Sequence, residues 1–453
     1  MASTIKVNNI QNQCGANIAN KCGSTVTLGA SGDTITLACG ASQTGFGRTG
    51  TVDWNTTAIT ADPANAVNGT GYFANTTSAA FTITLPTSPS AGDIVAVRDY
   101  AQTFATNNLT IGRNGQPIDG LTLDLTLNTK GAAVTLVYVD GTQGWKSVNS
   151  NETINALTYV AATGGTETTC GDYKIHTFTG PGTFTVTCGG SAGGSNTVDY
   201  LVIAGGAGGG GASSAGGGGG GGFRLSNSTC MPGPQTSPLA TPTALPVSAQ
   251  GYPITVGAGG SAGPGSSPSP GGSGGNSIFS TITSAGGGGG INDSNVASPG
   301  GSGGGAGNTG TVGVGNTPPV SPPQGNNGGQ GNNSSGGGGG GGAGALGGEG
   351  PNPPGTEGGV GGAGSFVVGS GFAGSNGTTG PVCGAKYFSG GGGGRSECTN
   401  KIGGVGGGGT GASGSSGVTA GTTNTGGGGG GGGSGGAGGA GGSGIVIIRY
   451  KYQ

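Results

Sequence analysis

The stretch YLVIAGGAGGGGASSAGGGGGGGFRL, residues 200–225, determines the fold of the larger part of this chain. An apolar segment leads directly into glycine, and after four small residues a second glycine run leads into another apolar segment. Glycine runs recur at 208–211, 216–222, 286–290, 336–342, 390–394, 406–409 and 426–433. The chain then ends in IVIIRYKY, residues 445–452, which is a strong strand signal.

Two structures are open to these glycine runs. They could be flexible linkers, or they could be polyglycine-II helices, which share the extended polyproline-II backbone and form no internal hydrogen bonds. In the second structure every N–H and C=O points outward and needs a partner in a neighbouring run. We favour a bundle because the runs recur, lack the serine pattern of a linker and are bracketed by apolar strands. We expect a small β-platform from which polyglycine-II helices rise and return.

The inserts between the runs would lie at the ends of such a bundle. Their ranges are 223–256, 291–299, 314–335, 346–357, 366–388 and 395–402. Exposed loops on a rigid scaffold often serve recognition, and aromatic and arginine side chains dominate binding energies. The candidate receptor-binding residues are therefore Arg224, Tyr252, Phe366, Phe372, Tyr387, Phe388, Arg395 and Lys401. The alternative is that the aromatic side chains fix the loops to the bundle or to a neighbouring chain.

Residues 1–50 carry short alternating segments at 24–28 and 34–37. Apolar residues at every second position predict strands. This stretch is too small to bury a core of its own, which suggests that it needs neighbouring copies of the chain.

Residues 51–152 read as consecutive strands with turn residues between them. The clearest alternating or apolar segments are 81–85, 94–97, 121–127 and 134–139. Short strands at regular spacing are typical of a β-sandwich or barrel. We therefore predict an all-β protein. It has an attachment segment at 1–50, a β-sandwich knob at 51–152 and a glycine-rich distal domain at 153–453.

Composition narrows the class of protein. Glycine supplies 121 of 453 residues, and charged residues only 7%, against about 25% in ordinary domains. The net charge of -2 does not favour nucleic acid or an anionic membrane as a partner. No segment reaches the roughly 20 apolar residues of a membrane span, and the N-terminus lacks a signal-peptide pattern. We expect no nucleic-acid binding and no membrane insertion.

The eight cysteines form no C-x-x-C pair, and His176 is the single histidine. Zinc sites need closely spaced Cys and His ligands, so we expect no metal site, and we expect no cofactor. Disulfides Cys170–Cys188 and Cys383–Cys398 are an open alternative to reduced thiols. His176 lies in the segment KIHTF, where we interpret it as a structural residue.

The catalytic motifs in this sequence occur no more often than chance predicts for a chain so rich in glycine. G-x-S-x-G occurs at 271–275, 300–304 and 432–436, but none joins a strand to a helix, as a nucleophile elbow requires. No Gly-Lys dipeptide exists, which excludes a P-loop. A glycan-cleaving enzyme would need two carboxylates about 5–10 Å apart, and we interpret Asp119 and Asp124 as turn and edge residues instead. We predict that the protein is not an enzyme.

Ordered motifs in the glycine-rich part resemble a known family. From Tyr173 the chain reads YKIHTFTGPGTFTVTCGG and then NTVDYLVIAGGAGGGG. YPITVGAGG at 252–260, NSIFSTITSAGGGGG at 276–290 and the terminal GGSGIVIIRYKYQ follow. This set resembles the glycine-rich domain of tail-fibre and adhesin proteins of bacteriophages, notably marine ones. The resemblance implies a polyglycine-II sandwich whose loops contact the host receptor.

The N-terminal half is similar to fibre proteins of marine phages. MASTIKVNNIQNQ and GASGDTITL resemble their virion-proximal start. Residues 71–115, GYFANTTSAAFTITLPTSPSAGDIVAVRDYAQTFATNNLTIGRNG, with LVYVDGTQGW at 136–145, resemble the knob-type β domain of tail fibres. The long proline-rich inserts at 223–256 and 314–357 depart from the family, so the identity of the receptor does not carry over.

The resemblance implies a homotrimer in the virion, assembled in the host cytoplasm. It would join other tail or virion proteins through its N-terminus and bind a host surface glycan or outer-membrane protein. Three other functions stay open. They are a virion protein without receptor contact (head fibre, decoration or adaptor), an ice-binding polyglycine-II bundle, and a depolymerase. An ice-binding bundle would want a strict Gly-x-x period, which the solid runs here lack.

Overall fold

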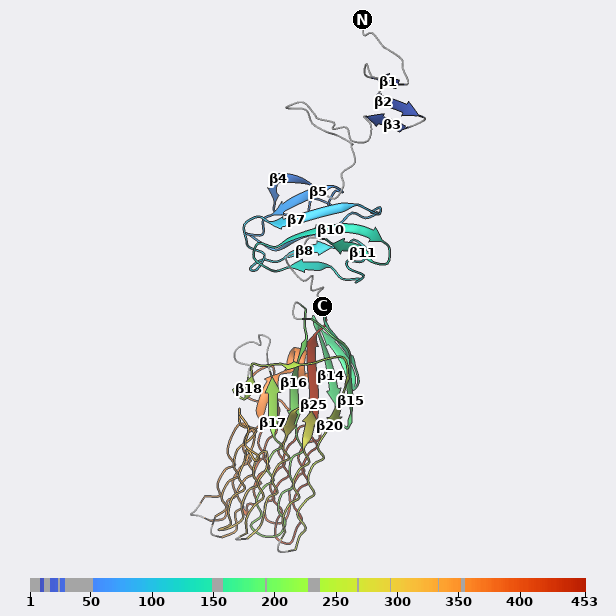
Figure 1. The fold of residues 1–453 in the computed structure, drawn as a ribbon. Helices are drawn as coiled ribbons and strands as arrows, with labels where there is room; N and C mark the ends of the chain where they lie inside the picture. The colour runs from blue at the N-terminus through green and yellow to red at the C-terminus, as the bar shows by residue number, and fades with distance from the viewer. Residues whose placement is uncertain are drawn as a thin grey trace.

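A computed structural model describes residues 9–11, 17–22, 25–28, 52–148, 158–191, 194–226, 237–266, 269–293, 295–332, 334–351 and 355–453. Within these residues the predicted all-β class is confirmed, and the one helical element is a π-helical turn, η2 (Gly369–Ala373). Strands β1 (Asn9–Gln11), β2 (Asn17–Cys22) and β3 (Thr25–Leu28) form an antiparallel sheet (Figure 1). The predicted strand at 34–37 lies outside the described residues.

A β-sandwich follows. One sheet has the order β11-β10-β7-β5-β4 and contains β4 (Asp53–Ile59), β5 (Thr70–Ala74), β7 (Ile94–Asp99), β10 (Ala133–Asp140) and β11 (Gly144–Ser147). The other has the order β6-β8-β9 and contains β6 (Phe81–Thr84), β8 (Leu109–Gly112) and β9 (Leu125–Leu127). Fully buried Leu85, Phe104 and Trp145 belong to the core of this sandwich.

The alternation of the sandwich strands is confirmed in part. Residues at every second position of β10 are buried in the core, so the apolar segment 134–139 forms a strand with one buried face. The predicted strand at 121–127 is shorter than expected. Leu121 exchanges backbone hydrogen bonds with Ile118 in a tight turn and is 39% exposed.

Two further sheets form the platform of the glycine-rich part. The first has the order β12-β15-β20-β21-β22 and contains β12 (Val160–Thr163), β15 (Gly182–Gly189), β20 (Gly251–Thr255), β21 (Ser277–Phe279) and β22 (Ile282–Ser284). The second has the order β13-β14-β25-β16-β17-β18 and contains β13 (Thr166–Cys170), β14 (Tyr173–Phe178), β25 (Ile445–Lys451), β16 (Thr197–Ile203), β17 (Phe223–Ser226) and β18 (Ala240–Thr241). Strand β19 (Leu245–Pro246) also pairs with β16.

The terminal strand β25 lies in the middle of the second platform sheet and is buried on both faces. Val446, Ile448 and Tyr450 pack into the core that the first platform sheet shares. Ile445 and Ile447 pack on the opposite face, against the hairpin of β23 (Ser365–Val368) and β24 (Ala385–Phe388). A strand buried on both faces reads as a continuous apolar run, which explains the unbroken IVII segment.

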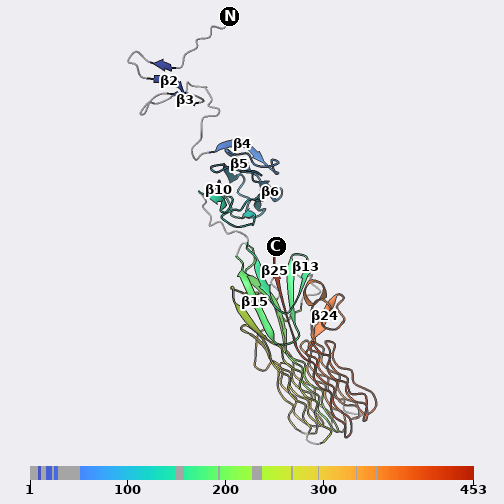
Figure 2. The same ribbon diagram turned by 90° about the vertical axis from the view of Figure 1, so that its right-hand side faces the viewer.

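The glycine runs form the predicted polyglycine-II bundle, which extends away from the platform sheets (Figures 1 and 2). Successive N–H groups of 205–211 donate in rotation to 269–275, 436–442 and 216–222, with N···O distances of 2.9–3.0 Å. Each neighbour is therefore met at every third residue, as the threefold polyproline-II geometry requires. The linker interpretation is wrong for these runs, because their N–H groups are hydrogen-bonded to other runs.

Run 216–222 shows how closely the bundle is packed. Its N–H groups donate to three segments, namely 285–291, 338–341 and 426–429. Its carbonyl groups, with that of Ala215, accept from three others, namely 204–210, 302–305 and 392–395. The run is thus surrounded by hydrogen-bonded backbone, and every N–H group in it has a backbone partner.

Close approach of backbones, and not backbone conformation, makes glycine necessary here. A Cβ atom at Gly217 would lie 2.1 Å from the carbonyl oxygen of Gly392, and one at Gly340 would lie 2.0 Å from that of Gly218. Neither glycine has a positive φ. Any side chain at these positions would push two runs apart and break their hydrogen bonds.

Candidate functional site

The bundle has two ends, and only one of them is free of the platform sheets. Run 205–211 leaves β16 and run 216–222 enters β17, so the turn between them lies at the end away from the sheets. Backbone hydrogen bonds place Arg395 beside Ala215 and Glu397 beside Thr356. We define the far end by residues 212–215, 292–293, 307–310, 334–335, 355–357, 395–401, 413–417 and 433–436.

The far end carries the charges of the bundle. The charged residues in 205–222, 257–364 and 389–444 are Asp293, Glu349, Glu357, Arg395, Glu397 and Lys401. All but Glu349 belong to the far end, and Glu349 precedes Gly350, whose N–H donates to Gln330 near that end. The interior has no room for such side chains, so charge can occur only where the runs turn.

Arg395 joins three segments of the far end. Its side chain is buried, at 3% exposure. Nη1 donates to the carbonyl oxygen of Ser335 at 2.6 Å, and Nη2 donates to Oγ of Ser434 at 3.0 Å. The Glu397 carboxylate lies 3.5 Å from Nη2. This arginine therefore holds neighbouring turns together and does not project into solvent.

Glu357 organises the adjacent loop. Its carboxylate forms an ion pair with Lys401 and accepts hydrogen bonds from Thr399 Oγ1 at 3.2 Å and Ser396 Oγ at 3.4 Å. The hydrogen bond from Lys401, with smaller contributions from the hydroxyls, lowers the pKa of Glu357 below its ordinary value. The exposed segment 397–400 is thus a defined loop.

Only Arg395 and Lys401 of the eight predicted contact residues lie at the far end. Five of the eight are buried and so are not available for contact with a receptor. These five are Tyr252, Phe372, Tyr387, Phe388 and Arg395. Tyr252 and Phe372 belong to platform cores. The burial of these aromatic residues favours the alternative that they fix loops to the scaffold.

Two more predicted residues lie on strands rather than loops. Arg224 is half-buried in β17, opposite Val202 of β16. Phe366 is half-buried in β23, where its ring lies 5.2 Å from that of Tyr387. Tyr387 in turn accepts a hydrogen bond from the N–H of Val382 at 3.2 Å, which fixes the loop after η2. Lys401 is half-buried and paired with Glu357.

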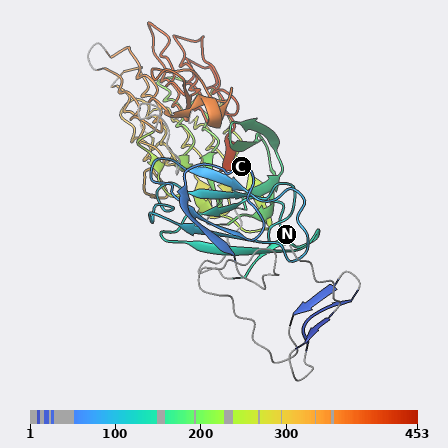
Figure 3. The same ribbon diagram turned by 90° about the horizontal axis from the view of Figure 1, so that it is seen from above.

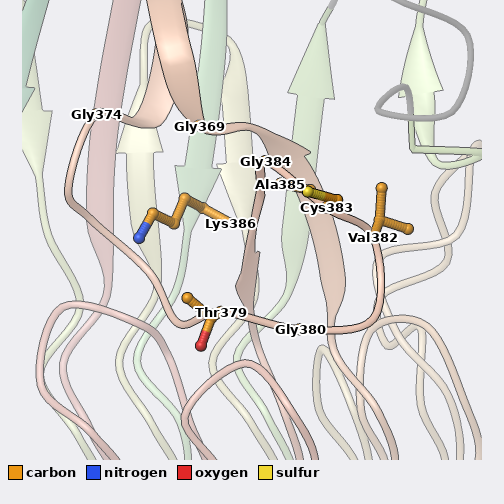
Figure 4. Close-up of a pocket in the computed structure, with 9 residues that line it drawn as sticks. All are labelled: Gly369, Gly374, Thr379, Gly380, Val382, Cys383, Gly384, Ala385 and Lys386. Carbon is orange, nitrogen blue, oxygen red and sulfur yellow. The ribbon is translucent and has the colours of Figure 1, made fainter.

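The insert 366–388 is not a far-end loop. Its hairpin lies beside the glycine runs near the platform sheets (Figures 2 and 3). A hollow of about 430 Å³ lies within this insert, lined by Thr379, Val382, Cys383, Lys386 and glycines (Figure 4). The hollow is a second, smaller candidate for ligand contact.

Sequence reasoning missed the short polar residues that form most of the far end. Serine dominates the turns ASSA at 212–215 and SGSS at 413–416, which lie outside every predicted insert, whereas SECTN at 396–400 lies within the predicted insert 395–402. Aromatic content gave no signal for them. The position of a turn in the sequence would have been a better criterion. A far-end turn lies between a glycine run that leaves a strand and a glycine run that returns to one.

The structure also gives the contacts of other residues that the sequence singled out. The thiols of Cys170, Cys188 and Cys398 are free, so neither Cys170–Cys188 nor Cys383–Cys398 is joined. Asp119 pairs with Lys146 at 3.3 Å, and Asp124 accepts a backbone N–H. Across the described residues, none of the helical structure has the length and apolar character of a membrane span.

The fold and the far end define a β-platform protein that displays short polar loops on a polyglycine-II bundle. The chain belongs to the glycine-rich domain family, whose profile matches residues 177–451. The match runs from β14 to the end of β25, which covers both strands that bracket the bundle. The chain has no significant match among curated proteins.

Proposed function

We propose that this protein is an adhesive fibre protein of a bacteriophage, whose far end contacts the host cell surface. The observation that supports this most is the segregation of residue types in the bundle. The interior admits glycine and a few small residues such as Ala207 and Ser302, whereas the charged side chains of the bundle gather at the turns away from the sheets. Such a scaffold lets loops change without changing the fold, which suits recognition of variable surfaces.

The remaining parts of the proposal rest on the resemblance to phage fibres. In it, residues 1–50 attach the protein to tail or virion proteins, the chain is a homotrimer in the virion, and the ligand is a surface glycan or an outer-membrane protein. Individual contacts can be weak, because several copies on one particle multiply avidity.

The alternative is a virion structural protein, such as a head fibre, decoration or adaptor protein. One observation favours it. The described far-end residues include no aromatic side chain, although aromatic residues dominate most binding hot spots. Recognition at this end would therefore rely on hydrogen bonds and shape.

A cell-adsorption assay distinguishes the two. Labelled full-length protein is mixed with candidate host strains, beside a variant with Gly-Ser residues in place of 396–400. The control variant carries Gly-Ser in place of Thr87 and Ser88, which are exposed in the turn after β6 of the sandwich. We expect adsorption of the protein and the control and loss with the far-end variant. Folded protein that adsorbs to no host strain would favour the structural alternative.

A further inference from the structure

The β-sandwich carries a groove that is independent of the far end. We call it the sandwich groove; it has a volume of about 370 Å³ and is lined by Thr56, Phe73, Arg98, Asp99, Tyr100 and Gln102. Strands β4, β5 and β7 supply its floor, and the chain after β7 supplies one wall. Pockets with aromatic walls and a few placed polar groups are typical of small-ligand sites.

Exposed aromatic rings follow one side of the sandwich groove. Tyr100 is 57% exposed and Trp54 is 42% exposed. The Trp54 ring lies 4.9 Å from that of Phe73, with 35° between the planes. Trp54 can lie flat on the sheet because its register partner is Gly71, and a Cβ there would lie 2.7 Å from the indole ring. A surface tryptophan placed this way is available for stacking.

The wall of the groove is held rigidly. Asp99 is only 4% exposed. Its carboxylate accepts backbone hydrogen bonds from Thr103, Phe104 and Gly131 at 3.1, 3.2 and 2.9 Å. Gln102 has a φ of 61°, in the left-handed region that non-glycine residues rarely adopt. Strained backbone of this kind concentrates at ligand sites, because surrounding contacts must hold it in place.

Arg98 supplies a cation that the protein itself does not neutralise. It is exposed in β7, and its register partner on β5 is Phe73, so the two side chains lie together on one face of the sheet. Among the described residues its guanidinium has no ion pair or hydrogen bond. The neighbouring Asp99 carboxylate is buried and directed to backbone N–H groups, so the Arg98 guanidinium is the charged group that the groove exposes.

We propose that the sandwich groove binds an acidic saccharide. The C–H face of a sugar ring stacks on Phe73 and Trp54, with Tyr100 at its edge. The Arg98 guanidinium forms a bidentate pair with the sugar carboxylate, a geometry that arginine provides and lysine does not. Gln102 and Thr56 are placed to hydrogen-bond the hydroxyl groups. This binding does not depend on what the far end contacts.

Tryptophan fluorescence of the full-length protein tests the proposal. The chain has two tryptophans, and Trp145 is fully buried, so a surface ligand perturbs Trp54 alone. The probes are tetragalacturonate and tetramannuronate, with maltotetraose as the neutral sugar. We expect saturable quenching by at least one uronate and none by maltotetraose. Arg98→Ala should weaken the Kd at least about tenfold, whereas Arg113→Ala, in the same sandwich, should not change it.

Gly71→Ala is a second test, since it displaces the indole ring of Trp54 without removing Arg98. We expect this variant to bind the uronate more weakly, and we expect thermal unfolding of its sandwich to stay cooperative. Three results would overturn the proposal. One is no response to either uronate at millimolar concentration, and another is equal binding of maltotetraose. The third is a change in the sedimentation coefficient of the Trp54→Ala variant while the unmodified protein shows no response to any saccharide. That result would make this face an interface between copies of the chain.

Discussion

The guanidinium of Arg449 lies 2.9 Å from the carboxylate of Asp199, and the two residues are 250 positions apart in the chain. Asp199 belongs to β16, which leads into the first glycine run, and Arg449 belongs to β25, which follows the last one. Their side chains are 3% and 7% exposed. Arg449 also lies between the rings of Tyr173 and Phe372. This buried pair therefore joins the entry and the exit of the bundle.

Asp199→Ala should weaken that junction strongly. It leaves a buried guanidinium without its carboxylate, which typically costs about 3–5 kcal/mol. Hydrogen exchange of β16 and β25 amides measures the loss as a lower local opening free energy. Lys174→Ala is the control, because its partly exposed pair with Glu167 is worth less than about 1 kcal/mol. Equal effects of the two substitutions would contradict a special role of the buried pair.

Gly340→Ala should destabilise the bundle even though it adds one methyl group. The added carbon would lie 2.0 Å from the carbonyl oxygen of Gly218, and backbone on both sides limits relief. Overpacking of this kind costs about 1–3 kcal/mol, and we expect the upper end. Gly180→Ala is the matched control, because no atom lies within 4 Å of its added carbon. Thermal unfolding compares the two, and an unchanged midpoint for Gly340→Ala would argue against close packing.

His176 predicts a loss of stability in mild acid. Its side chain is fully buried, its Nδ1 lies 2.7 Å from the Gly164 carbonyl oxygen, and its Nε2 lies 3.1 Å from the Tyr450 hydroxyl. Burial lowers the pKa of His176 below 6.5, against the smaller opposing effects of the Gly164 carbonyl and Glu167. The unfolded chain therefore binds a proton at a higher pH than the folded chain does.

The sign of the effect follows from that difference. Stability is fully present above the unfolded pKa, and it falls by up to about 1.4 kcal/mol for each pH unit below it, until the lower folded pKa is reached. Urea unfolding between neutral pH and pH 5 measures this slope. His176 is the single histidine of the chain, so His176→Gln should flatten the slope. A slope that survives the substitution would assign it to carboxylates.

Arg395→Gln should loosen the far end and leave the platform unchanged. The substitution removes hydrogen bonds to Ser335 and Ser434, and bonds from a charged donor are worth about 1.5–3 kcal/mol. We expect faster amide exchange at 334–336 and 434–436 with no change in β25. Lys401→Ala should have a smaller effect, because its ion pair is partly exposed. A uniform rise across the chain would mean global destabilisation instead.

Much of the fold could be predicted because local sequence patterns show which backbone hydrogen bonds each segment must form. The pattern in 445–452 predicts a strand, and glycine runs between such strands predict polyglycine-II helices, since their N–H groups need external partners. The site could not be predicted as well. Phe372 and Phe388 look like contact residues in a loop, yet they belong to a buried core with Ile445 and Ile447 of β25. Whether an aromatic residue faces solvent depends on which elements pack over it.

The sequence alone determined the all-β class and the polyglycine-II bundle, because strand alternation and bare backbone leave few other ways to satisfy hydrogen bonds. Only the tertiary structure decided which turns form the far end and which residues lie there. Arg395 and Lys401 share that end with Ser434 and Glu357, whereas Tyr252 lies in a platform core. The physical reason is that all glycine runs present the same backbone N–H and C=O groups, so hydrogen bonding alone does not specify which runs become neighbours. Side-chain packing in the platform sheets fixes where the runs start and end, and the glycine runs themselves carry no information about that packing.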